Sequence, residues 1–291
     1  MTRVPDLSTR PATLADAAAI HRLIGKPFVS LDTVSSDLAR PAIDLARDTL
    51  LTHTPDGELV GWAWVHLGRR AEAHVHAAHR GRGLGSRLLA FTEANARAAG
   101  SDRLGQNVDD ADPAAAQLLT AHGYQLKATS WLLHLALPDE PAVPDPPAGL
   151  SVRAYRDGDG PAVHELVEDS FAAFRSRRRD YAEWAQHIVQ RATFAPHLSC
   201  LAFDGERLVG VQLSLDLPDT SQGHIAELAV HSDYRGRDVG AFLLRQAFSD
   251  VYRHGRRGCE VWTHSDTGAL GFYQRAGMSV TRSGSHYSKA L

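Results

Sequence analysis

The sequence predicts an α/β protein made of two similar domains, each a mixed sheet flanked by helices. Residues 226–241 align without a gap with residues 71–86, which lie 155 positions earlier. A repeat of that length indicates two whole domains rather than the short units of a solenoid. Residues 138–149 contain five prolines and no hydrophobic periodicity, which predicts a stiff, extended linker. We therefore expect one domain over residues 1–137 and a second over residues 150–291.

The first half alternates strand and helix signals. Its strands are expected over residues 7–13, 49–53, 59–66, 71–76 and 103–108, with one or two more over 124–137. Its helices are expected from residue 14, in one or two pieces between 26 and 48, from residue 84, and over 113–122. Leu84, Leu88 and Phe91 recur at helical spacing, and Gly100 and Gly123 are natural helix ends.

The second half repeats this order. Its strands are expected over residues 150–155, 198–203, 207–217, 225–230, 259–264 and 279–291, the last of which closes the second domain. Its helices are expected over residues 161–174, 181–191 and 269–275, with another after the second loop. Arg153 stands only 143 residues after Arg10, so this half carries about 12 extra residues before its loop, mostly around a basic helix at 175–179.

A glycine-rich loop before residue 84 carries the first chemical signal. Gly81, Gly83 and Gly85 have no Cβ, so the backbone can bend tightly and another molecule can approach it closely. The first N–H groups of the following helix lack internal partners, and the helix dipole is positive there, which favours a phosphate. The arginines that strengthen this preference are Arg80, Arg82 and Arg87. The spacing fits neither the dinucleotide fingerprint nor a P-loop.

Arg80, Gly83 and Gly85 resemble the pyrophosphate loop of the GCN5-related N-acetyltransferases (GNAT), whose pattern is Arg/Gln-x-x-Gly-x-Gly/Ala. The resemblance covers nearly the whole chain, twice. It implies two tandem GNAT domains, each with a mixed, mostly antiparallel sheet, in an architecture similar to that of mycothiol synthase. The extra residues near 175–179 lie where this family's substrate-facing segment usually does.

The resemblance implies transfer of an acetyl group from acetyl-CoA, as co-substrate, to a primary amine of a small molecule by direct attack in a ternary complex. In the family, the loop holds the pyrophosphate and the preceding strand offers a backbone donor to the carbonyl oxygen. By this resemblance, the acetyl-CoA-binding residues are Val75, Arg80, Gly81, Arg82, Gly83, Leu84, Gly85 and Ser86 in the first half. Those of the second half are Val230, Arg235, Gly236, Arg237, Asp238, Val239, Gly240 and Ala241.

The presence of one tyrosine distinguishes the second half from the first. Tyr273 stands four residues before Gly277 and matches the family's F-Y-x-x-x-G pattern, whose tyrosine often protonates the leaving thiolate. Leu119 occupies the corresponding place before Gly123 and can donate no proton. On this criterion the C-terminal half is catalytic. The alternative is a structural tyrosine that packs on the sheet and satisfies its hydroxyl locally.

Glu227 is the preferred general base. It stands in an otherwise apolar strand, where a carboxylate costs free energy to bury unless it is paired or needed. Strand alternation places Glu227, Ala229 and His231 on one face, and His231 is a weaker candidate base. Glu72 occupies the matching place in the first half. An ordinary solvated or ion-paired strand residue remains the alternative for Glu227.

The sequences of the two loops favour the N-terminal half as the better acetyl-CoA-binding half. Asp238 stands where the first loop has Gly83, and a carboxylate near a pyrophosphate is repulsive by about 1 kcal/mol in water at 4 Å. We expect Asp238 to weaken acetyl-CoA binding without excluding it, because Arg235, Arg237 and Gly240 remain. These mismatched halves leave open a competing class, a non-catalytic sensor or scaffold that binds an acyl-CoA.

Composition indicates the class of protein, its compartment and its partners. The 291 residues are 43% hydrophobic with a net charge of −3, which is typical of a globular protein and argues against a nucleic-acid partner. No apolar run reaches the length of a membrane helix, and the first residues lack a signal peptide's apolar stretch, so we expect a cytoplasmic protein without a membrane partner. We expect a monomer or homodimer.

Two further features favour structural roles. Cys200 and Cys259 lie in apolar strand-like runs and are expected to be buried, reduced thiols. The histidines of residues 74–79 could suggest zinc, but His79 falls in the phosphate-binding loop, so we expect no metal. The basic stretch at 175–179 could face a phosphate, an acidic substrate or RNA, although a solvated helix face is the preferred interpretation.

Overall fold

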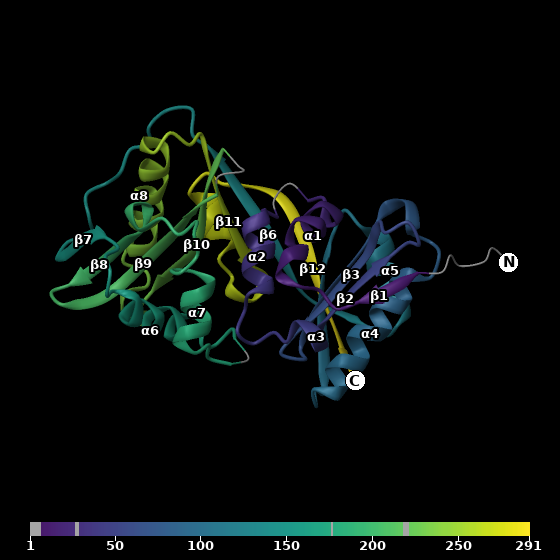
Figure 1. Ribbon diagram of the computed structural model, residues 1–291. Coiled ribbons are helices and arrows are strands. Elements are labelled where there is room, and N and C mark those ends of the chain that lie inside the picture. The colour runs from purple at the N-terminus through teal and green to yellow at the C-terminus, as the bar shows by residue number, and fades with distance from the viewer. Residues whose placement is uncertain (1–6, 27–28, 176, 218–220) are drawn as a thin grey trace. The chain divides into compact units, whose positions relative to one another are not determined.

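The computed structural model describes residues 7–26, 29–175, 177–217 and 221–291. The chain divides into two compact units: unit 1 comprises Met1–Thr129 and Gly284–Leu291, and unit 2 comprises Ser130–Ser283. Each unit is a mixed sheet flanked by helices (Figure 1). No helix in the described part of the chain is long and apolar enough to cross a membrane.

Unit 1 contains most of the elements predicted from the first half. Its strands are β1 (Ser8–Arg10), β2 (Thr49–His53), β3 (Leu59–His66), β4 (Arg70–Val75) and β5 (Arg103–Asp109), with part of β12 (Ser279–Ala290). Its helices are α1 (Ala17–Ile24), α2 (Leu31–Leu38), α3 (Leu45–Asp48), α4 (Leu84–Ala98) and α5 (Pro113–Ala121), with short 3-10 turns η1 (Leu14–Asp16) and η2 (Ala77–His79). The strand order is β1-β2-β3-β4-β5-β12, and only β4 and β5 pair in parallel.

Unit 2 repeats this plan. Its strands are β7 (Leu150–Ala154), β8 (Cys200–Asp204), β9 (Arg207–Asp216), β10 (Gln222–Val230) and β11 (Gly258–His264), with part of β6 (Gln125–Ala136). Its helices are α6 (Gly160–Phe171), α7 (Tyr181–His187), α8 (Val239–Arg253) and α9 (Leu270–Arg275), with 3-10 turns η3 (Pro196–Leu198), η4 (Ser232–Tyr234) and η5 (Ser265–Thr267). The order is β6-β11-β10-β9-β8-β7, and only β10 and β11 pair in parallel.

The last strand differs from the sequence expectation. The second part of β12 pairs with β5, from Gly284 opposite Asp109 to Ala290 opposite Arg103, and so completes the sheet of unit 1. The second part of β6, which leaves unit 1, pairs with β11 in unit 2 instead. Residues 279–291 therefore do not simply close the second domain. The domain limits at residues 137 and 150 stay a prediction from the repeat.

Two apolar layers cover the sheet of unit 2. Val163 and Val167 of α6 pack with Leu201 and Ala229, whereas Phe242 of α8 packs on the other face (Figure 1). Leu228 and Val230 lie against the α8 layer. The alternation predicted for β10 is confirmed, and it places Glu227 on the α6 face with Ala229.

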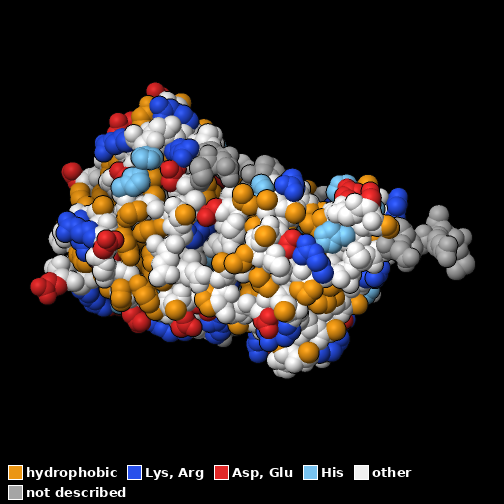
Figure 2. Space-filling view, in the orientation of Figure 1, with side chains coloured by type: hydrophobic (Ala, Val, Ile, Leu, Met, Phe, Trp, Pro, Cys, Tyr) orange, Lys and Arg blue, Asp and Glu red, His pale blue; other side chains and the backbone are white. Residues whose placement is uncertain are grey.

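The surface carries no large region of one charge sign in the view of Figure 2. Lys and Arg side chains alternate there with Asp and Glu side chains, and with scattered hydrophobic side chains. This distribution agrees with the small net charge of −3.

Candidate active site

The two glycine-rich segments adopt the same backbone conformation. In unit 1, η2 is followed by Gly83 with φ of 81°, which is the N-cap of α4. In unit 2, η4 is followed by Asp238 with φ of 60°, which is the N-cap of α8. Left-handed backbone is unusual for a residue with a Cβ, although Asp tolerates it better than most. The loop shape therefore persists in unit 2 despite the missing glycine.

The tips of both loops are open. A Cβ placed on Gly81, Gly83 or Gly236 would have no heavy atom within 4 Å, so these backbones are accessible. The first turns of α4 and α8 add N–H groups that the helix does not use. Asp238 is exposed and makes no ion pair among the described residues. This geometry fits an anionic group such as a pyrophosphate at each loop.

The arginines of the loops are held differently. The Nε atoms of Arg80 and Arg235 lie 3.5 and 3.4 Å from the carbonyl oxygens of Val75 and Val230, which are equivalent positions. Arg80 also forms a 3.0 Å ion pair with Asp112. The Arg235 Nη2 donates instead to a backbone carbonyl oxygen at 2.9 Å. The first loop therefore holds one of its cations with a carboxylate, and the second does not.

A gap opens between the two parallel strands of each unit. Pairing of β10 with β11 ends at Ile225 and Val261, although β10 continues to Val230 and β11 to His264. Pairing of β4 with β5 ends equally early, at Ala71. Beyond these points the facing strand edges are free of ladder partners in the described pairings. Glu227 lies on β10 just after the strands separate.

Glu227 is buried among opposite charges. Its side chain is 8% exposed, and its Oε1 lies 3.0 Å from the Arg179 Nη2 and 3.6 Å from the Arg175 Nη2. Glu168 of α6, 1% exposed, accepts from the Arg179 Nε at 2.8 Å and from the Arg179 backbone N–H at 2.9 Å. Burial works to raise the pKa of Glu168, but the donors of Arg179 and the charge of Arg175 hold that pKa below its ordinary value. Two carboxylates and two guanidinium groups therefore share one buried cluster.

Tyr273 reaches the same region from α9. The residue is 6% exposed and packs in the core of unit 2 with Ile225 and Val261, the last paired residues of β10 and β11. Burial raises the pKa of Tyr273 far above its ordinary value, and the negative charge of Glu227 raises it further. Its hydroxyl has no hydrogen-bond partner among the described residues. Tyr273 therefore keeps its proton at neutral pH and stands near Glu227.

Unit 1 presents a different set. Leu119 of α5 is buried at the place that corresponds to Tyr273 and offers no proton. Glu72 is bound by Arg70 of its own strand, with Nη2 to Oε1 at 2.7 Å. Burial opposes ionisation of Glu72, but His74 and Arg70 outweigh it and hold its pKa well below the ordinary value. Unit 1 thus pairs an intact loop with a leucine at the place of the candidate acid.

The basic stretch at 175–179 is not the solvated helix face that the sequence suggested. Its described residues lie in the non-helical connection between α6 and α7, and their guanidinium groups all pair with carboxylates of unit 2. Ser176 lies outside the described residues. Sequence reasoning missed that Arg175, Arg179 and Glu168 surround Glu227. The available signal was an arginine repeated four residues apart in a segment that the first half lacks.

The structure places the other residues in question as follows. Cys200 and Cys259 are buried, and burial raises the pKa of the Cys200 thiol to about 12. His231 accepts from the Arg207 guanidinium at 2.9 Å and lies at the start of η4. Among the described residues, no group of three or more His, Cys, Asp or Glu side chains is placed to hold a metal ion.

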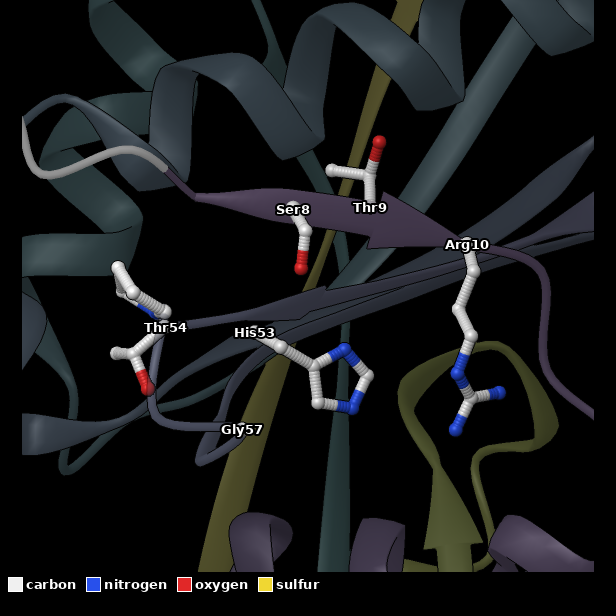
Figure 3. Close-up of a pocket in the computed structure, with 7 residues that line it drawn as sticks. Ser8, Thr9, Arg10, His53, Thr54 and Gly57 are labelled. Atoms are coloured by element: carbon white, nitrogen blue, oxygen red, sulfur yellow. The ribbon is translucent and has the colours of Figure 1, made fainter.

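A shallow pocket of about 420 Å³ lies elsewhere, on the β1–β2 edge of unit 1 (Figure 3). Ser8, Arg10 and His53 extend to one side of the strands, and Thr9 points to the other side. Arg10 is already paired with Asp16 at 2.6 Å. The pocket contains neither a glycine-rich loop nor a buried carboxylate, so it is not the candidate active site.

Comparison with known proteins agrees with this geometry. The model of the acetyltransferase (GNAT) family matches residues 18–124 and 161–278. The chain is 28% identical to the mycothiol acetyltransferase of Sanguibacter keddieii, over 94% of this chain and 93% of that protein. It is 30% identical to the mycothiol acetyltransferase of Nocardia farcinica, over 80% of each chain.

Solved structures show the same fold. A GCN5-related N-acetyltransferase from Sphaerobacter thermophilus has a TM-score of 0.80 and 28% identity, covering 99% of this chain and 96% of that one. A tandem GNAT protein from the clavulanic acid biosynthesis pathway has a TM-score of 0.78 and 19% identity, with 98% of each chain covered. The chain belongs to the acetyltransferase (GNAT) family and is an N-acetyltransferase with two copies of the family's domain in tandem.

Proposed function

We propose that this N-acetyltransferase moves an acetyl group from acetyl-CoA to the primary amine of a small molecule, and that unit 2 performs the chemistry. The observation that carries the proposal is that Glu227 and Tyr273 are both more than nine-tenths buried where β10 and β11 separate, and that the charge of Glu227 acts on Tyr273. The relatives are mycothiol acetyltransferases, which supports a small-molecule acceptor.

The loops supply the binding part of this proposal. The open tip at Gly236, the first turn of α8, and Arg235 and Arg237 form a site for the pyrophosphate of acetyl-CoA. The intact loop of unit 1, with Gly81 and Gly83, is proposed to bind the same group. The free edge of β10 near Val230 offers backbone donors toward the carbonyl oxygen.

The chemical step divides between two side chains. The amine nitrogen attacks the thioester carbonyl carbon, the C–S bond breaks, and the amide product and the CoA thiol form. Glu227 accepts the proton that the nitrogen loses, and Tyr273 gives its hydroxyl proton to the leaving sulfur. The raised pKa of Tyr273 keeps that proton available at neutral pH. Solvent then reprotonates Tyr273 and takes the proton from Glu227.

Direct transfer is favoured over an acetyl-cysteine intermediate. A nucleophilic cysteine needs an accessible thiolate of lowered pKa. Cys200 and Cys259 are both buried in the core, and burial raises the pKa of each thiol. A ternary complex of enzyme, acetyl-CoA and amine is therefore the proposed route.

The two matching carboxylates test this assignment. Glu227→Gln is expected to lower kcat by about 100-fold, because general base catalysis contributes factors of ~10² to ~10⁴. Glu72→Gln is the matched control and should change kcat by less than about twofold, since Glu72 has no acid partner at Leu119. The measurement is thiol release from acetyl-CoA with a panel of primary amines.

The reverse pattern, with turnover lost only in Glu72→Gln, would show that unit 1 is catalytic. Binding of acetyl-CoA without thiol release for any amine would favour the sensor instead.

A further inference from the structure

We infer that Arg175 and Arg179 are positioning residues for Glu227: they hold its Oε1 and leave its Oε2 for the amine. This inference rests on the proposed function, because it concerns the same site. It gives a role to the basic stretch of unit 2, which the acetyltransferase chemistry by itself does not require.

The contacts to Glu227 are one-sided. The Arg179 Nη2 donates to Oε1 at 3.0 Å, and the Arg175 Nη2 lies 3.6 Å from the same oxygen. Oε2 accepts no hydrogen bond from the residues that the structure describes. A carboxylate held by one oxygen keeps a fixed orientation while its second oxygen stays free to accept a proton. That division is what a general base needs.

Glu168 fixes the arginines in turn. It accepts from the Nε and the backbone N–H of Arg179 and from the Nη1 of Arg175, so both guanidinium groups bridge Glu168 and Glu227. Its side chain is 1% exposed, so this pairing takes place in the interior of unit 2. Glu168 also offsets part of the positive charge that Glu227 experiences. The cluster therefore sets both the orientation and the charge environment of the base.

The groups that face Glu227 come from three elements. Arg175 and Arg179 come from the connection between α6 and α7, Glu168 from α6, and Tyr273 from α9. The paired strand β9 places the uncharged residue Leu213 opposite Glu227. Glu72 in unit 1 is instead bound by Arg70, two residues away on its own strand.

Two substitutions should move the pH profile of turnover in opposite directions. Arg179→Gln removes a cation beside the proposed base, so the acidic limb of kcat/KM for the amine should move to higher pH. Glu168→Gln leaves the arginine charge less balanced, so this limb should move to lower pH. The measurement is kcat/KM for the amine as a function of pH in the wild type and in each variant.

Kinetics at a fixed pH provide the second readout. Arg179→Gln should lower kcat about tenfold at neutral pH, with the KM of acetyl-CoA changed by less than about twofold. Arg179→Lys keeps the charge but not the planar fork, so it should restore the midpoint of the pH profile and only part of kcat. Arg178→Gln is the matched control, because Arg178 pairs with Glu165 and Asp169 and touches neither Glu168 nor Glu227. It should leave both readouts unchanged.

General loosening of the fold would act in the same way in Arg179→Gln and Glu168→Gln, whereas removal of opposite charges acts in opposite directions. Shifts of the same sign in the two variants, or no shift in either, would therefore overturn the inference. Failure of the proposed function is a separate result. If the Glu227→Gln variant turns over substrate at the wild-type rate, Glu227 is not the base, whatever the pH profiles of the other variants show. If Glu227→Gln is inactive but Arg179→Gln keeps the wild-type midpoint and kcat, the positioning role alone is wrong.

Discussion

At the scale of single residues, two buried tyrosines differ in the groups that lie near their hydroxyls. Tyr273 of unit 2 stands near Glu227 where the strands separate. Tyr124 of unit 1 is 3% exposed, and its hydroxyl has no hydrogen-bond partner among the described residues. Burial raises the pKa of Tyr124 to about 12, so it also stays protonated. The carboxylate beside it, that of Glu93, is already paired with Lys289 and Arg97.

The matched pair of Tyr→Phe changes should therefore separate activity from stability. Tyr273→Phe should lower kcat by about 10- to 100-fold and leave the KM of acetyl-CoA nearly unchanged, because only protonation of the leaving thiolate is lost. Tyr124→Phe should leave kcat unchanged and raise the free energy of unfolding by about 1 kcal/mol, because an unsatisfied buried hydroxyl is removed. Steady-state kinetics and urea unfolding measure these effects. Equal kcat in wild type and Tyr273→Phe would assign Tyr273 to the core alone.

At the same scale, the sequence singled out candidate residues but did not predict what surrounds them. Glu227 stands out because a charge in an apolar strand is unusual, and Tyr273 because it belongs to a short contiguous motif. The ion pairs of Glu227 could not be predicted, because Arg179 lies 48 residues away along the chain. Their discovery replaces the expectation of a solvated basic helix.

At the scale of elements, the second loop allows its charge to be changed without a change in its backbone conformation. Asp238 adopts the same left-handed conformation as Gly83, so at this position the two loops share their backbone shape and differ by a carboxylate. Asn tolerates this conformation equally well, whereas most other side chains do not. Asp238→Asn is therefore a change of charge alone.

Asp238→Asn should lower the KM of acetyl-CoA by about fivefold, which corresponds to about 1 kcal/mol of repulsion removed. Steady-state turnover reports the catalytic unit only, so binding at the other loop does not obscure the effect. Gly83→Asn is the control in unit 1 and should leave this KM unchanged. An unchanged KM in Asp238→Asn would mean that the carboxylate points away from the phosphates.

At the scale of the whole molecule, the exchange of last strands makes each unit depend on distant sequence. Gly284–Ala290 pair with β5, and Leu291 joins an apolar cluster with Val65 and Leu104. Lys289 also forms a 2.9 Å ion pair with Glu93 of α4. The end of the chain therefore belongs to the fold of its first half.

A chain that ends at Ser283 should lose hydrogen-exchange protection in β5, because that strand becomes an unpaired edge. Lys289→Ala is the control and should keep that protection, since a partly exposed ion pair contributes at most about 1 kcal/mol. Hydrogen exchange read by mass spectrometry distinguishes the two variants. Loss of protection confined to unit 2 would contradict the strand pairing.

The sequence by itself determined the family, the doubled domain, most strands and helices, and the place of the two glycine-rich loops. Short contiguous patterns carry all of these: apolar periodicity, glycine at a turn, and a tyrosine four residues before a glycine. Only the tertiary structure decided what surrounds Glu227 and which sheet receives β12. Those outcomes depend on contacts between residues far apart in the chain, where burial free energy and strand pairing select the partner and no local pattern records it.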